Sequence, residues 1–198
     1  IGILGVVLFS AKAVMVKLAY QYNVSAVNLL MFRMLFALPF YIAVLLFTKK
    51  ESEKLPRKNY VWLIVFGFIG YYLASYFDFV GLQYIKASIE RIILFIYPTI
   101  VLLLSSIFLK RPISRVQVFA ISITYIGIII AFWDEISVDG AQFLLGAGFI
   151  FLSAITYASY LVGSDWLIPK FGVVRFTSYA MIVSCVSVIL HYSLFEHT

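Results

Sequence analysis

Charged residues, cysteine and histidine are all scarce in this sequence, and each shortage excludes a class of protein. Only 12% of the 198 residues are charged, which is too few for the surface of a typical soluble domain. The single cysteine, Cys185, lies in an apolar run, so a disulfide within the chain is excluded and a packing role is favoured over reactivity. The two histidines, His191 and His197, have no spacing typical of a metal site.

The motifs of ATP-driven and enzymatic proteins are also missing. The sequence contains no glycine-rich loop of the Walker type, which argues against an ATP-driven pump. Because no catalytic set of residues is present either, we predict no enzymatic activity, no cofactor and no metal. The net charge of +6 lies mainly in short segments between apolar runs, so we predict no nucleic-acid partner.

Long apolar runs make up most of the chain. Hydrophobic residues account for 64% of the sequence, and the mean hydropathy is +1.04. A helix needs roughly 20 apolar residues to cross a bilayer, and polar breaks divide the chain into seven such runs, 2–20, 27–47, 60–81, 88–109, 116–133, 143–163 and 176–195. The stretch IILFIYPTIVLLLSSIFL is apolar on every face, unlike the alternating strands of a β-barrel. We therefore predict an all-α integral membrane protein, a polytopic helical bundle.

The connections between these runs differ in charge. Basic residues gather in the second, fourth and sixth connections, whereas the first, third and fifth contain only Lys86. By the positive-inside rule, the even connections face the cytoplasm. We predict a multi-pass protein of the cell inner (plasma) membrane with a cytoplasmic amino terminus, which disfavours a seven-helix receptor because its amino terminus lies outside.

The chain also contains a weak internal repeat. The segments around Ser10-Ala11 and Ser153-Ala154 share the order helix, short polar break, helix. Because the second copy begins five helices after the first, an odd number, it must insert upside down. Inverted repeats are typical of secondary transporters, whose substrate sites lie between the two halves.

Several residues resemble the EamA-type branch of the drug/metabolite transporter superfamily. The resemblance rests on Ser10 and Lys17 in the first helix, Arg33 in the second, Pro98 in the fourth, and the sequence FLKRPIS that closes the fourth. It implies ten helices in two inverted five-helix repeats, with residues 1–133 as the first repeat and 141–198 as an incomplete second one. Seven of the ten helices would then be present, and roughly the last three would be missing at the carboxyl-terminal side.

Two departures from the family pattern limit what the resemblance implies about substrate. Lys110-Arg111 stands where the family has an acidic residue after the fourth helix. Ser25-Ala26 stands where the family has a proline at the start of the second helix.

Six charged residues fall inside the predicted spans, namely Lys12, Lys17, Asp78, Glu90, Arg33 and Arg91. A charge near the bilayer centre costs roughly 2.5–3.5 kcal/mol on insertion scales, so such residues usually face protein or water. Four bases against two acids predict a cavity with net positive charge. Lys12 and Lys17 lie about 140° apart around a helix and cannot face one narrow seam.

Each of these charges has a structural interpretation and a functional one. Lys17 can extend to the outer headgroups, and Glu90 can stabilise the start of the fourth helix. Asp78 and Arg91 are equally far from the turn between the third and fourth helices, which predicts a salt bridge. Alternatively, Asp78 or Glu90 carries a proton during transport.

The candidate site is assembled from these charges and from aromatic residues. The expected substrate-binding or translocation path comprises Lys12, Lys17, Arg33, Tyr157 and Tyr160. Pro39 and Pro98 interrupt helical hydrogen bonding and are candidate hinges, with static kinks as the alternative.

The sequence therefore favours a secondary transporter that moves a small polar metabolite or drug by alternating access, and the positive cavity favours an anionic one. The expected partners are this small molecule, the lipid bilayer and coupled protons, while the oligomeric state stays open. The alternative is a membrane sensor or scaffold that transports nothing.

Overall fold

The computed structural model describes residues 2–48, 55–131, 133 and 140–195. The elements are α1 (Gly2–Tyr20), α2 (Ala26–Phe47), α3 (Arg57–Gly67), the π-helix η1 (Phe68–Leu73), α4 (Ala74–Tyr84), α5 (Ala87–Leu94), α6 (Tyr97–Phe108), α7 (Arg115–Ala131), α8 (Gly140–Phe171) and α9 (Val173–Phe195). Among the described residues, five segments are long and apolar enough to cross a membrane: α2, α3 to α4, α5 to α6, α8 and α9. The predicted helical membrane protein is confirmed.

The third and fourth predicted spans contain irregularities that the apolar pattern did not reveal. The third runs without interruption from Arg57 to Tyr84 but includes the six-residue π-helix η1. The fourth is broken between α5 and α6, and Pro98 lies in the first turn of α6, where a missing backbone N–H costs no helical hydrogen bond. By contrast, α2 continues through Pro39.

The predicted end of the sixth span at residue 163 is wrong, because α8 continues to Phe171 and is 32 residues long. Asp165 and Lys170, which suggested a connection, lie within this helix. The turn to α9 is made by Gly172 alone, with φ of +74°, a left-handed conformation that glycine adopts without steric cost. The sixth connection is therefore much shorter than predicted.

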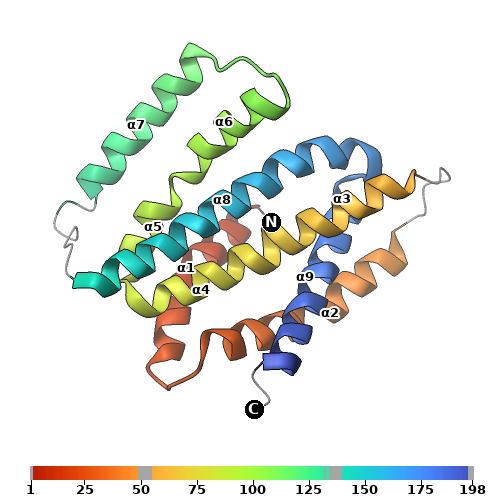
Figure 1. Cartoon of the computed structure of the whole chain (residues 1–198), viewed down its shortest axis with the longest axis horizontal. Helices are drawn as coiled ribbons and strands as arrows, with labels where there is room; N and C mark the ends of the chain where they lie inside the picture. The colour runs from red at the N-terminus through yellow and green to blue at the C-terminus, as the bar shows by residue number, and fades with distance from the viewer. Residues whose placement is uncertain (1, 49–54, 132, 134–139, 196–198) are drawn as a thin grey trace.

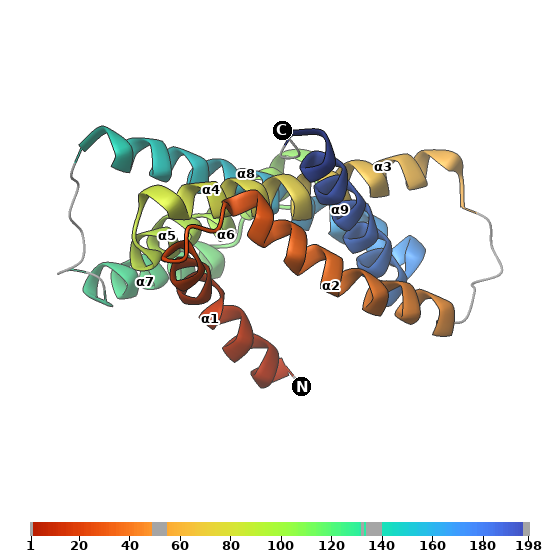
Figure 2. The same cartoon turned by 90° about the horizontal axis from the view of Figure 1, so that it is seen from below.

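The long segment from α3 to α4 runs antiparallel to α8 (Figure 1). At one end the ring of Tyr60 lies 5.2 Å from that of Phe171, and at the other Tyr84 lies 6.5 Å from Phe149. On one side α9 packs against α2, and on the other α6 lies beside α8. Figure 2 shows α1 leaving the layer formed by α4 and α8, and its contacts are mainly with α4 and α5.

Side chains from α2, α4 and α9 form an apolar core. Leu30, Met34, Phe79, Leu82 and Val188 are among its fully buried members. Cys185 is also buried there, with Sγ 3.8 Å from Sδ of Met34. The cysteine is thus a packing residue.

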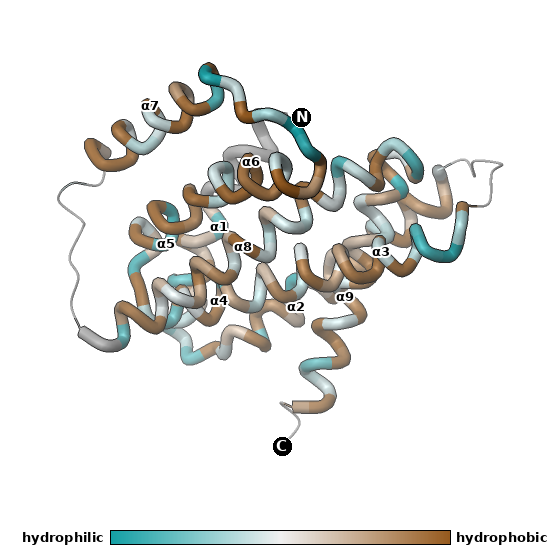
Figure 3. The backbone as a smooth tube through the Cα atoms, turned by 45° about the horizontal axis from the view of Figure 1, so that its top comes forward, coloured by the Kyte–Doolittle hydropathy of each residue, from teal (hydrophilic) through white to brown (hydrophobic). Residues whose placement is uncertain are grey.

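Polar residues gather at the connections between helices (Figure 3). At one end of the bundle, Lys170 Nζ donates a hydrogen bond to Asn59 Oδ1 at 3.4 Å, and Arg111 Nη1 lies 2.5 Å from Asp165 Oδ2. These contacts bring the start of α3 and the connection between α6 and α7 to the carboxyl-terminal end of α8. Gln83, before the third connection, shares a pocket at the opposite end with residues of the first.

This arrangement gives a test of orientation. Pro56→Cys and Tyr22→Cys place thiols at opposite ends without changing the charge. If the basic end faces the cytoplasm, an impermeant maleimide should label Cys at position 22 in intact cells and Cys at position 56 only after permeabilisation. Cys185 is 0% exposed, so the maleimide should label this native cysteine little. Labelling of position 56 in intact cells would overturn the predicted topology.

Candidate functional site

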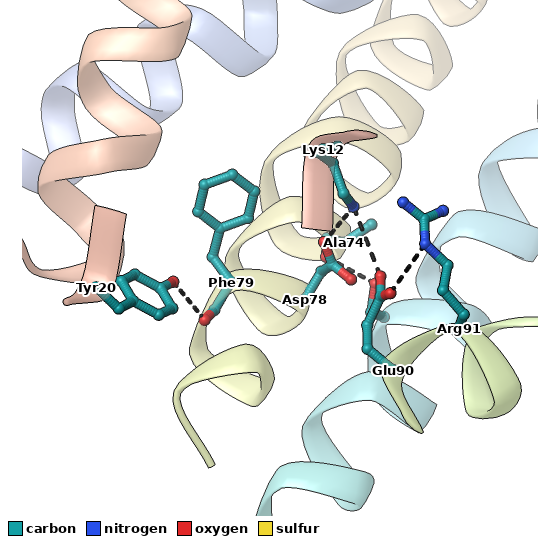
Figure 4. A network of polar contacts seen from close by, with 8 residues as sticks. Lys12, Tyr20, Ala74, Asp78, Phe79, Glu90 and Arg91 are labelled. Atoms are coloured by element: carbon teal, nitrogen blue, oxygen red, sulfur yellow. Dashed lines mark hydrogen bonds and ion pairs between the residues drawn. The ribbon is translucent and has the colours of Figure 1, made fainter. Parts of the chain in front are cut away.

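Four charged side chains meet between α1, α4 and α5 (Figure 4). Lys12 Nζ lies 2.5 Å from Asp78 Oδ2 and 3.8 Å from Glu90 Oε1. Arg91 Nε lies 3.2 Å from Glu90 Oε2. Because Asp78 is 3% exposed and Glu90 is 0% exposed, these ion pairs lie in the protein interior. We call these four residues the charge cluster.

The charge cluster explains how an apolar helix accommodates Lys12. Two bases face two acids, so the bases offset the cost of burying the carboxylates. A hydrogen bond of 2.7 Å from Tyr20 Oη to the carbonyl of Phe79 also ties α1 to α4. These contacts place α1 so that Lys12 reaches Asp78.

The sequence-based pairing of Asp78 with Arg91 differs from the observed ion pairs. The structure pairs Asp78 with Lys12 and Arg91 with its neighbour Glu90. Counting residues from a turn predicts depth in the membrane but neglects α1, which packs on both α4 and α5. Glu90 does lie in the first turn of α5, as expected, but it also joins the charge cluster.

A cavity of about 330 Å³ adjoins the charge cluster. Its charged lining consists of Lys12, Arg33, Asp78 and Arg91. Arg33 differs from the other two bases: within the described part of the chain, no carboxylate forms an ion pair with it, and its guanidinium lies 5.6 Å from the centre of the Phe79 ring. Arg33 is therefore the lining base that is available to a ligand.

Aromatic residues form another part of the lining. Tyr71, Tyr97 and Tyr157 line the cavity, and the rings of Tyr97 and Tyr157 meet edge to face at 5.5 Å. Behind them Tyr160, only 5% exposed, donates a hydrogen bond of 3.2 Å from its hydroxyl to that of Tyr71. We call Tyr71, Tyr97 and Tyr157 the tyrosine wall.

A glycine allows Tyr160 of α8 to approach the long third segment. A Cβ atom at Gly70 would lie 2.1 Å from Cβ of Tyr160, far inside van der Waals contact. Four residues further along this segment, the carbonyl of Ala74 accepts a hydrogen bond of 2.8 Å from Ser153 Oγ. Small residues thus let α8 lie directly against η1 and α4.

The structure brings some of the expected path residues together and separates others. Lys12, Arg33 and Tyr157 line the cavity, whereas Tyr160 supports it from behind. Lys17 lies in a second, open pocket of about 590 Å³ at the end of α1, with Asn23 and Gln83 among its neighbours. Lys17 and Arg33, which were both expected on one path, therefore line different pockets.

Gly70, Tyr71, Tyr97 and Ser153 are among the lining residues that sequence reasoning did not place in the site. Ser153 had carried a signal as the match of Ser10 in the internal repeat. In the ranges the structure covers, no group of three or more His, Cys, Asp or Glu side chains is arranged to hold a metal ion.

Apolar helices of membrane-spanning length around a charged and aromatic cavity define a helical membrane protein with a candidate small-molecule site. Residues 1–133 match the EamA-like transporter family, and the chain belongs to this family. It is 28% identical over 190 residues to the uncharacterized transporter YcbK of Bacillus subtilis (strain 168), covering 96% of this chain and 61% of YcbK.

Two further relatives cover less of the chain. The uncharacterized transporter YyaM of Bacillus subtilis (strain 168) is 28% identical over 156 residues, covering 75% of this chain and 50% of YyaM. An uncharacterized transporter of Archaeoglobus fulgidus is 24% identical over 147 residues, covering 74% of this chain and 50% of the relative. The chain thus spans between half and about three fifths of the relatives it matches.

Proposed function

We propose that the protein is a secondary transporter that carries a small polar anion across the cell inner membrane by alternating access. The observation that carries this proposal is Arg33, a base without a carboxylate partner in the described structure, on the lining of a cavity among membrane helices. Membership of the EamA-like transporter family supports the transport part of the proposal.

The charges around the cavity favour an anion. Its lining includes three bases, of which Lys12 and Arg91 already face Asp78 and Glu90. Arg33 thus adds a positive charge to a charge cluster that is balanced within itself. An anion that enters the cavity compensates this charge, and charge-assisted hydrogen bonds to arginine are among the stronger ones in proteins.

Asp78 and Glu90 are our candidates for proton coupling. Asp78 lines the cavity, and Glu90 lies behind it with Lys12 between the two carboxyl groups (Figure 4). A proton that arrives at either carboxyl group changes the charge with which Lys12 interacts. Such a change is one way to link proton movement to substrate binding.

The proposal includes the repeat architecture of the full-length transporter. Residues 1–133 would form the first five-helix repeat and residues 141–198 the start of an inverted second repeat, in a protein of ten helices. The family match over residues 1–133 supports the first boundary. The break before Pro98 is the better hinge candidate, because α2 continues through Pro39.

Arg33→Gln is the test of this proposal. The variant should fold normally and should lose tenfold or more of the uptake of a small carboxylate into proteoliposomes, because a hydrogen bond to a charged group contributes about 1.5–3 kcal/mol. Arg57→Gln, at the basic end of the bundle, is the matched control and should transport normally. Equal uptake by Arg33→Gln and the wild-type protein would refute the anion site.

A further inference from the structure

The tyrosine wall restricts the chemical class of the ligand further than the charges of the cavity do. Tyr97 and Tyr157 come from α6 and α8 and meet edge to face at 5.5 Å. Both line the same cavity as Arg33. A ligand in this cavity therefore encounters aromatic rings as well as a guanidinium group.

The wall is held in place before a ligand binds. Tyr157 stacks at 6.2 Å on Tyr160, whose ring lies 4.7 Å from that of Tyr71. Tyr160 in turn stacks on Phe176 of α9 at 5.9 Å. Because these rings support one another across η1, α8 and α9, the faces offered to the cavity need little reorganisation on binding.

Aromatic rings in a pocket bind either a cation over the ring face or a flat apolar group. The charges of the lining decide between these two. The lining contains one acid, Asp78, and three bases, Lys12, Arg33 and Arg91. Lys12 Nζ already forms an ion pair with Asp78 Oδ2 at 2.5 Å. A cationic ligand would meet a lining with net positive charge, so the rings are left for a flat apolar group.

We propose that the substrate is a small anion with an aromatic ring, whose acidic group binds Arg33 and whose ring packs on Tyr97 and Tyr157. This inference rests on the proposed function and narrows its substrate class. The volume of about 330 Å³ lies at the lower end for ligand pockets and suits a molecule with one ring.

Four probes separate the features of such a ligand: phenylacetate, cyclohexylacetate, acetate and 2-phenylethylammonium. Their dissociation constants are measured from the thermal stabilisation of the purified protein at increasing concentration. We expect phenylacetate to bind about three- to tenfold more tightly than cyclohexylacetate, the range that an aromatic pair contributes beyond buried area. Acetate should bind more weakly still, and 2-phenylethylammonium should not bind.

Variants of the wall assign the preference to particular rings. Tyr157→Leu should reduce the ratio of phenylacetate to cyclohexylacetate affinity to about one, and Tyr157→Phe should retain it. Tyr97→Leu should have the same effect as Tyr157→Leu and serves if the latter does not fold. Tyr22→Leu is the control, since Tyr22 is 81% exposed at the far end of α1.

The outcomes distinguish this inference from the proposed function. Equal binding of phenylacetate and cyclohexylacetate by the wild-type protein would overturn the aromatic substrate class, while loss of both in Arg33→Gln would preserve the anion site. Binding of 2-phenylethylammonium in preference to phenylacetate would identify a cation site instead. Binding of none of the carboxylates would overturn both proposals.

Discussion

Lys12→Met is expected to lower the free energy of unfolding by about 3–5 kcal/mol, the cost typical of removing one partner from a buried ion pair. The substitution leaves Asp78 and Glu90, which are 3% and 0% exposed, with Arg91 as the remaining base of the charge cluster. The measurement is unfolding of the purified protein in mixed micelles with increasing denaturing detergent. Transport should be lost as well, because Asp78 lines the cavity.

Two variants control this experiment. Lys17→Met removes a base from the same helix but from the outer pocket, and it should change stability little. Lys12→Met combined with Asp78→Asn removes both charges of the 2.5 Å pair and should recover much of the lost stability. If Lys12→Met is as stable as Lys17→Met, the observed ion pairs contribute nothing to folding. Arg33→Gln should behave differently from Lys12→Met, with normal stability and impaired transport.

Gly70→Ala is expected to reduce transport at least tenfold and to destabilise the protein by about 1–3 kcal/mol, the usual cost of overpacking. The new Cβ would lie 2.1 Å from Cβ of Tyr160, so Tyr160 or the helix backbone has to move. Movement of Tyr160 displaces Tyr71 and Tyr157, which contact it and line the cavity. Uptake by proteoliposomes and thermal unfolding measure the two effects.

Helix propensity alone predicts the opposite result, because alanine is favoured over glycine within a helix by about 1 kcal/mol. Gly148→Ala in α8 and Gly127→Ala in α7 isolate this effect, since a Cβ at either position meets nothing within 4 Å. Both should be neutral or slightly more stable. If Gly70→Ala is as active and stable as Gly148→Ala, the close contact between Gly70 and Tyr160 is not needed for transport or stability.

The sequence predicts most of the fold because apolar length is a strong signal for a membrane helix. The predicted span 2–20 coincides with α1, and the span 27–47 differs from α2 by one residue. The end of α8 was missed because Asp165 and Lys170 look like part of a connection. In the structure Asp165 pairs with Arg111, and Lys170 lies over the ring of Trp166 at 3.6 Å, so the helix continues with its charges compensated.

The site was harder to predict because sequence fixes depth along a helix better than it fixes neighbours around it. The angular separation of Lys12 and Lys17 correctly indicated that they cannot share one seam, and they line different pockets. Which acid Lys12 meets depends on how α1 crosses α4 and α5, a property of tertiary packing. Hydropathy also does not reveal the π-helix η1, which contains the lining residue Tyr71.

The π-helix η1 has a consequence for how mutations in this protein should group. A π-helix fits one more residue into a turn than the surrounding α-helix does, and each added residue rotates the next stretch of helix by about 100°. Before η1, α3 packs mainly against α9; after it, α4 packs mainly against α8 and α2. One continuous helix therefore keeps α8 beside it throughout but changes its other main neighbour from α9 to α2. In a genetic screen, second-site suppressors of defects in α3 should be found in α9, and suppressors of defects in α4 in α8 and α2.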